Sequence, residues 1–249
     1  MTRPGGGPGA PVTVACMTTR RRDLLVVVLA FVSGYTDGVG FLALGGAFTS
    51  VMTGNMVLLG LSAGRGDGEG VGRALGAILA FIAGAALGTR VAGVASKQDV
   101  TWPRPVNRAL ALELAILTCS AVGWFVTVGR PPTVVQFVLL LISAVALGVQ
   151  SSTVQRFGVS GLSTTYLTGT LTSAVIHLVS RRTARGSERH WNIIGALVIG
   201  ATAAAVMHGV ARPALPVPQL VGLGFVLVVA VRTTRREDRA TAAPGTSGA

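Results

Sequence analysis

The sequence predicts an all-α, polytopic helical membrane protein, and three observations lead to this prediction. Hydrophobic residues make up 50% of the 249 residues, charged residues only 12%, and the mean hydropathy is +0.64. The charges are segregated, which leaves apolar runs of about 20 residues, long enough for a helix to cross a hydrocarbon core about 30 Å thick. These runs lack the polar–apolar alternation of β-barrel strands. Helices are therefore the expected spanning elements, because lipid offers a backbone no hydrogen-bond partners.

The apolar segments follow one another along the chain at 24–43, 47–63, 71–94, 109–128, 133–150, 162–179, 191–210 and 214–231. Residues 1–19 are rich in Gly, Pro and Thr, and we expect them to form a disordered N-terminal tail. We likewise expect a disordered C-terminal tail over 236–249. Between the tails we expect a single membrane domain over 20–235, with halves at 20–130 and 131–235.

Two of the segments, 47–63 and 162–179, are short and rich in hydroxyl groups and glycine. They match each other at an offset of 115 residues, which pairs 49–50 with 164–165 and 53–54 with 168–169. With a one-residue slip, Gly34 falls on Gly148. Agreement at several positions over one offset predicts an internal duplication.

The topology then has two solutions. If every segment spans the bilayer, the halves are parallel four-helix repeats. If the two short segments are broken or re-entrant, about six helices span the bilayer, each half contributes three, and the halves are inverted. The second solution places more of the Lys and Arg residues of the connections on the cytoplasmic side. We therefore expect six spans and two cytoplasmic termini.

The formal net charge of +12 does not indicate a nucleic-acid partner. The basic residues stand between apolar runs and at the ends, as in Arg20-Arg21-Arg22, which is typical of cytoplasmic loops. Motifs for nucleotide binding, zinc or a serine nucleophile are absent from the sequence. Neither His177 nor His208 has a second ligand at metal spacing. We expect no enzyme activity, cofactor or metal, and the lipid bilayer as the partner.

Asp37 is the first candidate functional residue, because it lies well inside the first apolar segment. A carboxylate at membrane depth costs a few kcal/mol or more, so it normally faces a cavity or a partner or carries a proton. The functional interpretation is a proton or cation site. The alternative is a structural carboxyl that hydroxyl groups or backbone amides satisfy, with the neighbours Tyr35 and Thr36 as the source.

The two short segments supply the other candidates. Gly permits a helix break, and Thr and Asn side chains can satisfy the freed backbone groups. Interrupted segments at matching positions often mark the substrate site of a transporter with repeated halves. Helix packing explains small and hydroxyl residues equally well. The predicted substrate or ion pathway contains Asp37, Thr53, Gly54, Asn55, Gln150, Thr168 and Gly169. For Glu113, near the start of the segment at 109, we expect a place at the membrane interface beside Arg108.

The stretch from Ser33 to Asn55 resembles the signature of the YoaK-like family of bacterial inner-membrane proteins. The similarity lies in the aspartate after a Gly-Tyr pair, a Phe-Leu-x-Leu-Gly-Gly core and a terminal Thr-Gly-Asn. The stretches 146–151 and 168–170 look similar to its second half. The resemblance covers roughly residues 20–235 and implies a protein of the bacterial inner membrane with six helices. It implies no activity.

Two functional hypotheses from different classes follow. The first is a small secondary transporter or channel for a small molecule or ion, with two homologous halves and Asp37 as a coupling proton site. The second is a non-transporting scaffold or accessory subunit in which the same residues only pack helices. Gly-x-x-x-Gly spacings, such as the pair Gly84 and Gly88, suit packing within the monomer or in a homo-oligomer.

Overall fold

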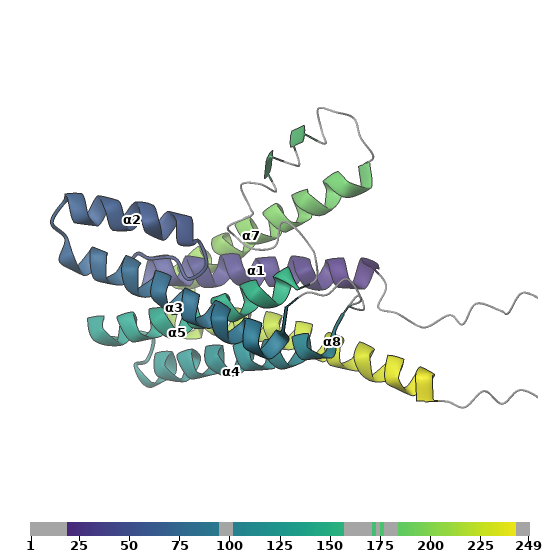
Figure 1. The fold of residues 1–249 in the computed structure, drawn as a ribbon. Helices are drawn as coiled ribbons and strands as arrows, with labels where there is room; N and C mark the ends of the chain where they lie inside the picture. Colours follow the sequence, from purple (N-terminus) through teal and green to yellow (C-terminus); the bar gives the residue numbers. More distant parts are fainter. Residues whose placement is uncertain (1–18, 95–101, 157–170, 173–174, 177–183, 243–249) are drawn as a thin grey trace, which may run out of the picture.

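The computed structural model describes residues 19–94, 102–156, 171–172, 175–176 and 184–242, and every regular element in these ranges is helical (Figure 1). Within the described part, six helices are long and apolar enough to cross a membrane. They are α1 (Thr19–Ala43), α3 (Gly68–Ala92), α4 (Arg104–Val126), α5 (Thr133–Gln155), α7 (Ala184–Val210) and α8 (Val217–Ala242). The all-α class and the six candidate spans are therefore confirmed. The segment 162–179 falls almost entirely outside the described residues.

Several helices continue beyond the apolar segments that predict them. α5 runs to Gln155 instead of 150, and the backbone of α8 stays helical through part of the predicted C-terminal tail. α4 begins at Arg104, five residues earlier than expected, with Pro103 as its N-cap and Pro105 in its first turn. Proline suits this place because the first N–H groups of a helix have no intrahelical partner. Hydropathy therefore finds the centre of each helix more accurately than its ends.

The predicted segment 47–63 becomes a loop followed by a short helix, α2 (Met52–Gly64). Its 13 residues extend about 20 Å, too short for a complete span. The chain turns at Gly66, where φ is +70°, and Asp67 caps α3 by accepting a hydrogen bond from the backbone N–H of Gly70 at 3.0 Å. α2 and α3 then pack against each other as a hairpin.

α1 is the central helix of the bundle. In its apolar window 67% of the residues are buried, against 17% in α3. α1 contacts α7, α8 and α5, while α3 contacts α5, α2 and α4 (Figure 1). A short 3₁₀ helix, η2 (Arg212–Ala214), leads into α8, and the Tyr35 hydroxyl donates to the carbonyl of Leu215 just after it, at 2.8 Å. α1, which carries the candidate residue Asp37, therefore packs against three neighbouring helices.

α1 crosses α7 at very short range through glycine. A Cβ added to Gly34 would lie 2.1 Å from the carbonyl oxygen of Leu197, and one added to Gly200 would lie 2.2 Å from that of Phe31. No side chain fits at either position without moving a backbone. The small residues thus permit the close approach that membrane helices use in place of a hydrophobic driving force.

α5 crosses α3 through the same pattern. A Cβ added to Gly148 would lie 2.3 Å from the carbonyl oxygen of Phe81, and one added to Gly84 would lie 2.1 Å from that of Val145. On α5, Val145 and Gly148 lie 114 residues after Phe31 and Gly34 of α1. On α3, Phe81 and Gly84 lie 116 residues before Leu197 and Gly200 of α7. Both crossings thus have a reciprocal pair of glycine–carbonyl contacts at matching places.

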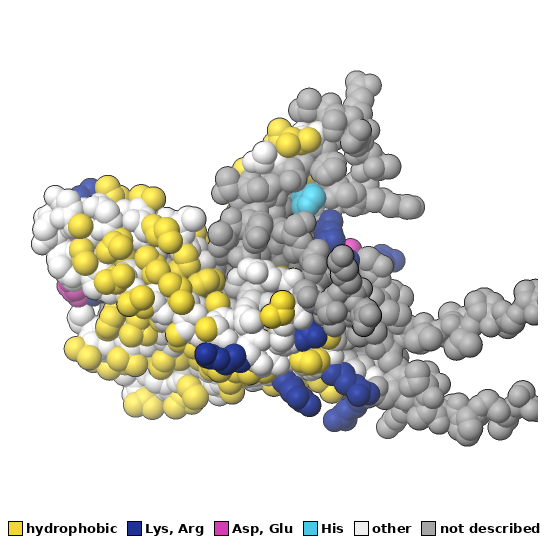
Figure 2. Space-filling model, in the orientation of Figure 1, with side chains coloured by type: hydrophobic (Ala, Val, Ile, Leu, Met, Phe, Trp, Pro, Cys, Tyr) yellow, Lys and Arg dark blue, Asp and Glu magenta, His cyan; other side chains and the backbone are white. Residues whose placement is uncertain are grey.

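The outer surface of α2 and α3 is apolar. Large aliphatic side chains gather there on the side of the molecule away from the chain ends (Figure 2). They include Met56, Val57, Leu61, Leu75, Leu79 and Ile82, each more than 40% exposed. A contiguous apolar surface of this kind is expected where lipid covers the protein.

Candidate functional site

The carboxylate of Asp37 binds the loop that connects α1 to α2. Its Oδ1 accepts hydrogen bonds from the backbone N–H groups of Thr49 and Ser50, at 2.8 and 2.7 Å, and from the Thr49 hydroxyl at 2.9 Å. Its Oδ2 accepts a bond of 2.5 Å from the Ser50 hydroxyl, whose oxygen lies 3.1 Å from the hydroxyl oxygen of Ser33. Asp37 is only 6% exposed. The carboxylate is thus buried among four neutral donors.

This geometry requires the chain to turn back along α1. Asp37 lies six residues before the end of α1, or about 9 Å along the helix axis. Thr49 and Ser50 follow the end of α1 but lie at the level of Asp37. Gly45 and Gly46 form the reversal, with φ of +108° and +82°, in the region of backbone conformation that glycine tolerates best.

Asn55 holds the same loop from its other side. Its Nδ2 donates to the carbonyl oxygen of Phe48 at 2.7 Å, and its Oδ1 accepts from the N–H of Phe48 at 2.9 Å. Asn55 is fully buried in the first turn of α2. One side chain therefore satisfies both backbone groups of a residue that has left regular secondary structure, as buried backbone groups require.

The cationic side chain that binds the loop is that of Arg73. Its guanidinium donates to the carbonyl of Gly45 at 3.3 Å and forms an ion pair with Glu69, one turn earlier on α3. Arg73 thus binds the outer bend of the loop rather than Asp37.

Hydrogen bonds to an ionised group are roughly twice as strong as neutral ones, so the four donors to Asp37 offset much of the cost of burying its charge.

The predicted pathway residues are brought together only in part. Asp37 and Asn55 meet through the loop between them, while Thr53 is exposed and Gly54 packs against Phe48 and Val51. Thr168 and Gly169 lie outside the described residues.

Gln150 lies at another level of the bundle from Asp37. Its Nε2 donates to the carbonyl of Leu29 at 3.1 Å, and Leu29 precedes Asp37 on α1 by eight residues, or about 12 Å.

Sequence reasoning missed the residues that bind the carboxylate. The structural alternative offers Tyr35 and Thr36 as partners, but the Tyr35 hydroxyl donates to the carbonyl of Leu215 and the Thr36 hydroxyl to the carbonyl of Val32 at 2.8 Å. The donors are Thr49 and Ser50 instead. The only signal for them in the sequence is their hydroxyl-rich, glycine-bounded segment, since nothing local predicts which residue of α1 they reach.

The expected interfacial place of Glu113 is wrong. Because α4 begins at Arg104, Glu113 lies nine residues into the helix, and its exposure is 0%. Both carboxyl oxygens lack a hydrogen-bond partner among the described residues. The Oε1 of Gln150 is also buried without a partner. Arg108, its expected neighbour, is exposed on another face of α4.

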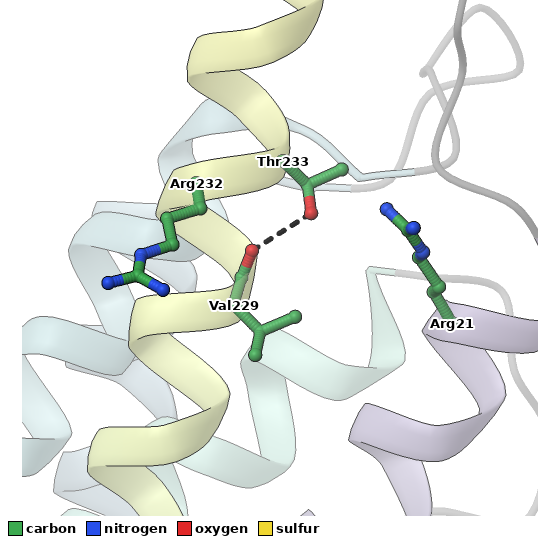
Figure 3. A pocket seen from close by; sticks show the side chains of 4 residues that line it. All are labelled: Arg21, Val229, Arg232 and Thr233. Atoms are coloured by element: carbon green, nitrogen blue, oxygen red, sulfur yellow. Dashed lines mark hydrogen bonds between the residues drawn. The ribbon is translucent and has the colours of Figure 1, made fainter.

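A separate pocket of about 160 Å³ opens where α1 begins and the apolar part of α8 ends (Figure 3). Arg21 of α1 lines it together with Val229, Arg232 and Thr233 of α8. The Thr233 hydroxyl donates to the carbonyl of Val229 at 2.9 Å. The predicted pathway residues do not line this pocket, and its two guanidinium groups give it a basic character.

Comparison with known proteins places the chain in a family. A family model described as "Protein of unknown function (DUF1275)" matches residues 25–231. The UPF0700 transmembrane protein YoaK of Bacillus subtilis (strain 168) is 36% identical over 160 residues, which are 64% of this chain and 68% of that protein. No solved structure matches the chain significantly. The chain is thus a multi-pass membrane protein that belongs to the DUF1275 family, in agreement with its resemblance to YoaK-like proteins.

Proposed function

We propose that this protein is a small secondary transporter or channel of the bacterial inner membrane, and that its pathway passes the loop between α1 and α2. The observation that carries the proposal is the buried carboxylate of Asp37 bound to non-helical backbone inside the bundle. Irregular backbone at membrane depth is tolerated only where it is buried in protein or lines a cavity. In transporters such interrupted segments are where substrates and coupling ions bind.

Residues 44–64 form a re-entrant segment in this proposal. The hydrogen bonds of Asp37 support it, because they bring residues 49–50 back to the level of Asp37 before α2 begins. The length of α2, about 20 Å, matches a return to the surface from which the loop entered. The N-terminus of α2, whose first N–H groups have no partner within the helix, then points into the membrane near the loop.

Two inverted halves are the second part of the proposal. The reciprocal glycine contacts support it, since α1 with α7 and α5 with α3 make equivalent crossings. Each crossing joins the first spanning helix of one half to the second spanning helix of the other half. The position equivalent to Asp37 in the second half is Ser151. At this pair of positions, only the first half therefore supplies a carboxylate.

Asp37 acts as the proton-coupling residue in this proposal. Its Oδ1 must accept from two backbone N–H groups, so Oδ2 is the oxygen that can take up a proton. The protonated Oδ2 would donate to the Ser50 hydroxyl, which would turn its own hydrogen to Ser33, 3.1 Å away. Protonation would thus rearrange the hydrogen bonds that hold the loop, and this links the proton to the opening of the pathway.

The orientation follows from the basic residues. Arg20 to Arg22 precede the apolar part of α1, Arg104 starts α4 and Arg235 follows the apolar part of α8, all at one end of the bundle. The pocket with Arg21 and Arg232 lies at this end (Figure 3). From the positive-inside rule we infer that this end and both termini face the cytoplasm. Anionic lipid headgroups of the cytoplasmic leaflet would neutralise its arginines.

Flux measurements test the proposal. Purified protein is reconstituted into sealed liposomes that contain the pH-sensitive dye pyranine. External solutes are then added by class: amino acids, carboxylates, sugars and monovalent cations. We expect one class to move protons with the wild-type protein and not with Asp37→Asn. The matched control is Asp67→Asn, which changes an exposed carboxylate outside the spans and should leave the flux unchanged. Equal flux in Asp37→Asn would remove the coupling role.

The scaffold function remains the second candidate, because the four hydrogen bonds of Asp37 also suit a purely structural carboxylate. The two functions separate in the same pair of variants. A scaffold predicts that Asp37→Asn lowers thermal stability or changes the oligomer size while no solute moves with either protein. Solute movement with the wild-type protein would exclude it.

A further inference from the structure

A second buried carboxyl, Glu113, lies in the bundle apart from the loop of Asp37. It is 0% exposed, and Leu110 and Leu117, one turn before and after it on α4, are fully buried as well. Neither of its oxygens has a donor among the described residues. Gln150 of α5 is 4% exposed, and its amide oxygen also lacks a donor. Unsatisfied acceptors of this kind are rare in native interiors and call for an explanation.

The register of the two helices brings these groups together. α4 and α5 are antiparallel neighbours, and the hydroxyl oxygens of Ser120 and Ser143 lie 3.2 Å apart across their interface. Glu113 lies seven residues before Ser120, and Gln150 lies seven residues after Ser143. Seven residues are close to two turns, so both side chains return to the same face of their helices at the same level. The register therefore predicts that Glu113 and Gln150 face each other across the α4–α5 interface.

All three unpaired atoms are acceptors. The Nε2 of Gln150 donates one hydrogen to the carbonyl of Leu29, and neither oxygen of Glu113 accepts its other hydrogen. The Oε1 of Gln150 accepts no hydrogen bond either, and an ionised Glu113 has no hydrogen to give it. An ionised carboxylate without a partner in a low-dielectric interior costs several kcal/mol. One added hydrogen on Glu113 would neutralise the carboxyl and supply the donor that the Gln150 oxygen needs.

Charged groups of the neighbouring helices do not supply that donor. α5 contains no charged residue from Thr133 to Gln155. The hydrogen bond between Asn107 and Thr234 sets the register of α8, which places Leu227 and Val228 at the level of Glu113. The charged residues of α1 lie at Asp23 and before it, or at Asp37, and Leu29 stands at the level of Gln150.

The arginines of α3 and α4 are directed elsewhere. Arg90 of α3 is exposed, and Arg73 is paired with Glu69 near the opposite end of that helix. Arg104 and Arg108 of α4 are exposed as well. A cationic side chain therefore does not neutralise Glu113 within the described part of the bundle, and a proton is the smallest ligand that does.

We propose that Glu113 and Gln150 form a buried proton-binding site. The carboxyl of Glu113 holds a proton at neutral pH and donates it to the Oε1 of Gln150, while the Nε2 of Gln150 keeps its bond to the carbonyl of Leu29. The bound proton comes from water and returns to water, with no other bond made or broken. Through Leu29, the site is linked to the helix that carries Asp37. The site requires neither transport nor a coupling role of Asp37.

Infrared spectroscopy of the purified protein in lipid tests the site directly. A protonated carboxyl group has a carbonyl stretching band that an ionised carboxylate lacks, and the band shifts in D2O. We expect this band at neutral pH in the wild-type protein and its loss in Glu113→Gln, which preserves the shape of the side chain. Asp37→Asn should retain the band. Gln150→Leu should shift it, because the hydrogen-bond acceptor is removed.

Two results would overturn the proposal. One is a protonated-carboxyl region that is the same for wild type and Glu113→Gln, which means that Glu113 is ionised. The other is a band that is absent in sodium chloride and appears only when a bulky organic cation replaces sodium, which means that the site binds Na⁺. If Gln150→Leu does not fold, the comparison of wild type with Glu113→Gln still decides. A failure of the flux experiment leaves this band unaffected, so the two proposals fail independently.

Discussion

Replacement of Asp37 by alanine removes the acceptor for four hydrogen bonds to the loop after α1. The hydroxyls of Thr49 and Ser50 can turn to other acceptors, and Ser33 lies 3.1 Å from Ser50. Their two backbone N–H groups cannot turn. A buried donor left unsatisfied costs about 1–3 kcal/mol, so Asp37→Ala should lower the free energy of unfolding by about 2–6 kcal/mol. Asp37→Asn keeps an acceptor oxygen for both N–H groups and should cost less.

Unfolding of the purified protein in mixed micelles, titrated with a denaturing detergent and followed by circular dichroism, measures this difference. The control is Asp67→Ala, which removes an exposed N-cap and should cost about 1 kcal/mol. We expect the order wild type, Asp37→Asn, Asp37→Ala from most to least stable. Equal stability of Asp37→Ala and wild type would refute the role of the carboxylate in holding the loop.

The remaining predictions concern the loop and the helix crossings. Asn55→Ala removes both hydrogen bonds to the backbone of Phe48 and should lower the free energy of unfolding by about 2–6 kcal/mol in the same assay. An unchanged unfolding midpoint would show that Asn55 does not hold the loop. Gly34→Val and Gly148→Val should destabilise by similar amounts, about 1–3 kcal/mol or more, since each forces a side chain into a carbonyl oxygen at an equivalent crossing. Gly60→Ala is the control for both, because a Cβ at position 60 would meet no atom within 4 Å. A large loss of stability for only one of Gly34→Val and Gly148→Val would count against equivalent halves.

Apolar runs and positive-inside counting were sufficient to predict six candidate spans, because both reflect the bilayer itself. They were not sufficient for helix ends. The run that contains Glu113 begins near Ala109, but α4 starts at Arg104 because Pro103 and Pro105 favour a first turn there. This shift of five residues moves Glu113 from the expected interface to a fully buried place in the bundle.

The candidate site was predictable only in its unusual residue. Asp37 stands out in the sequence because a carboxylate is rare inside an apolar run. Its partners do not, since Thr49 and Ser50 reach it through a chain reversal at Gly45 and Gly46 that depends on tertiary packing. The same limit holds for Gln150, which donates to the carbonyl of Leu29, about 12 Å along α1 from Asp37.

A cysteine-accessibility map in inverted and right-side-out vesicles tests most directly whether the protein has six spans and the proposed inverted halves. Single cysteines at Gly66, Gln98 and Ser187 are introduced into a background that lacks Cys16 and Cys119. We predict that a membrane-impermeant thiol reagent labels position 66 from outside and positions 98 and 187 from the cytoplasmic side. Labelling of position 66 from the cytoplasmic side and of position 98 from outside would contradict the account, because it would mean eight complete spans and parallel halves.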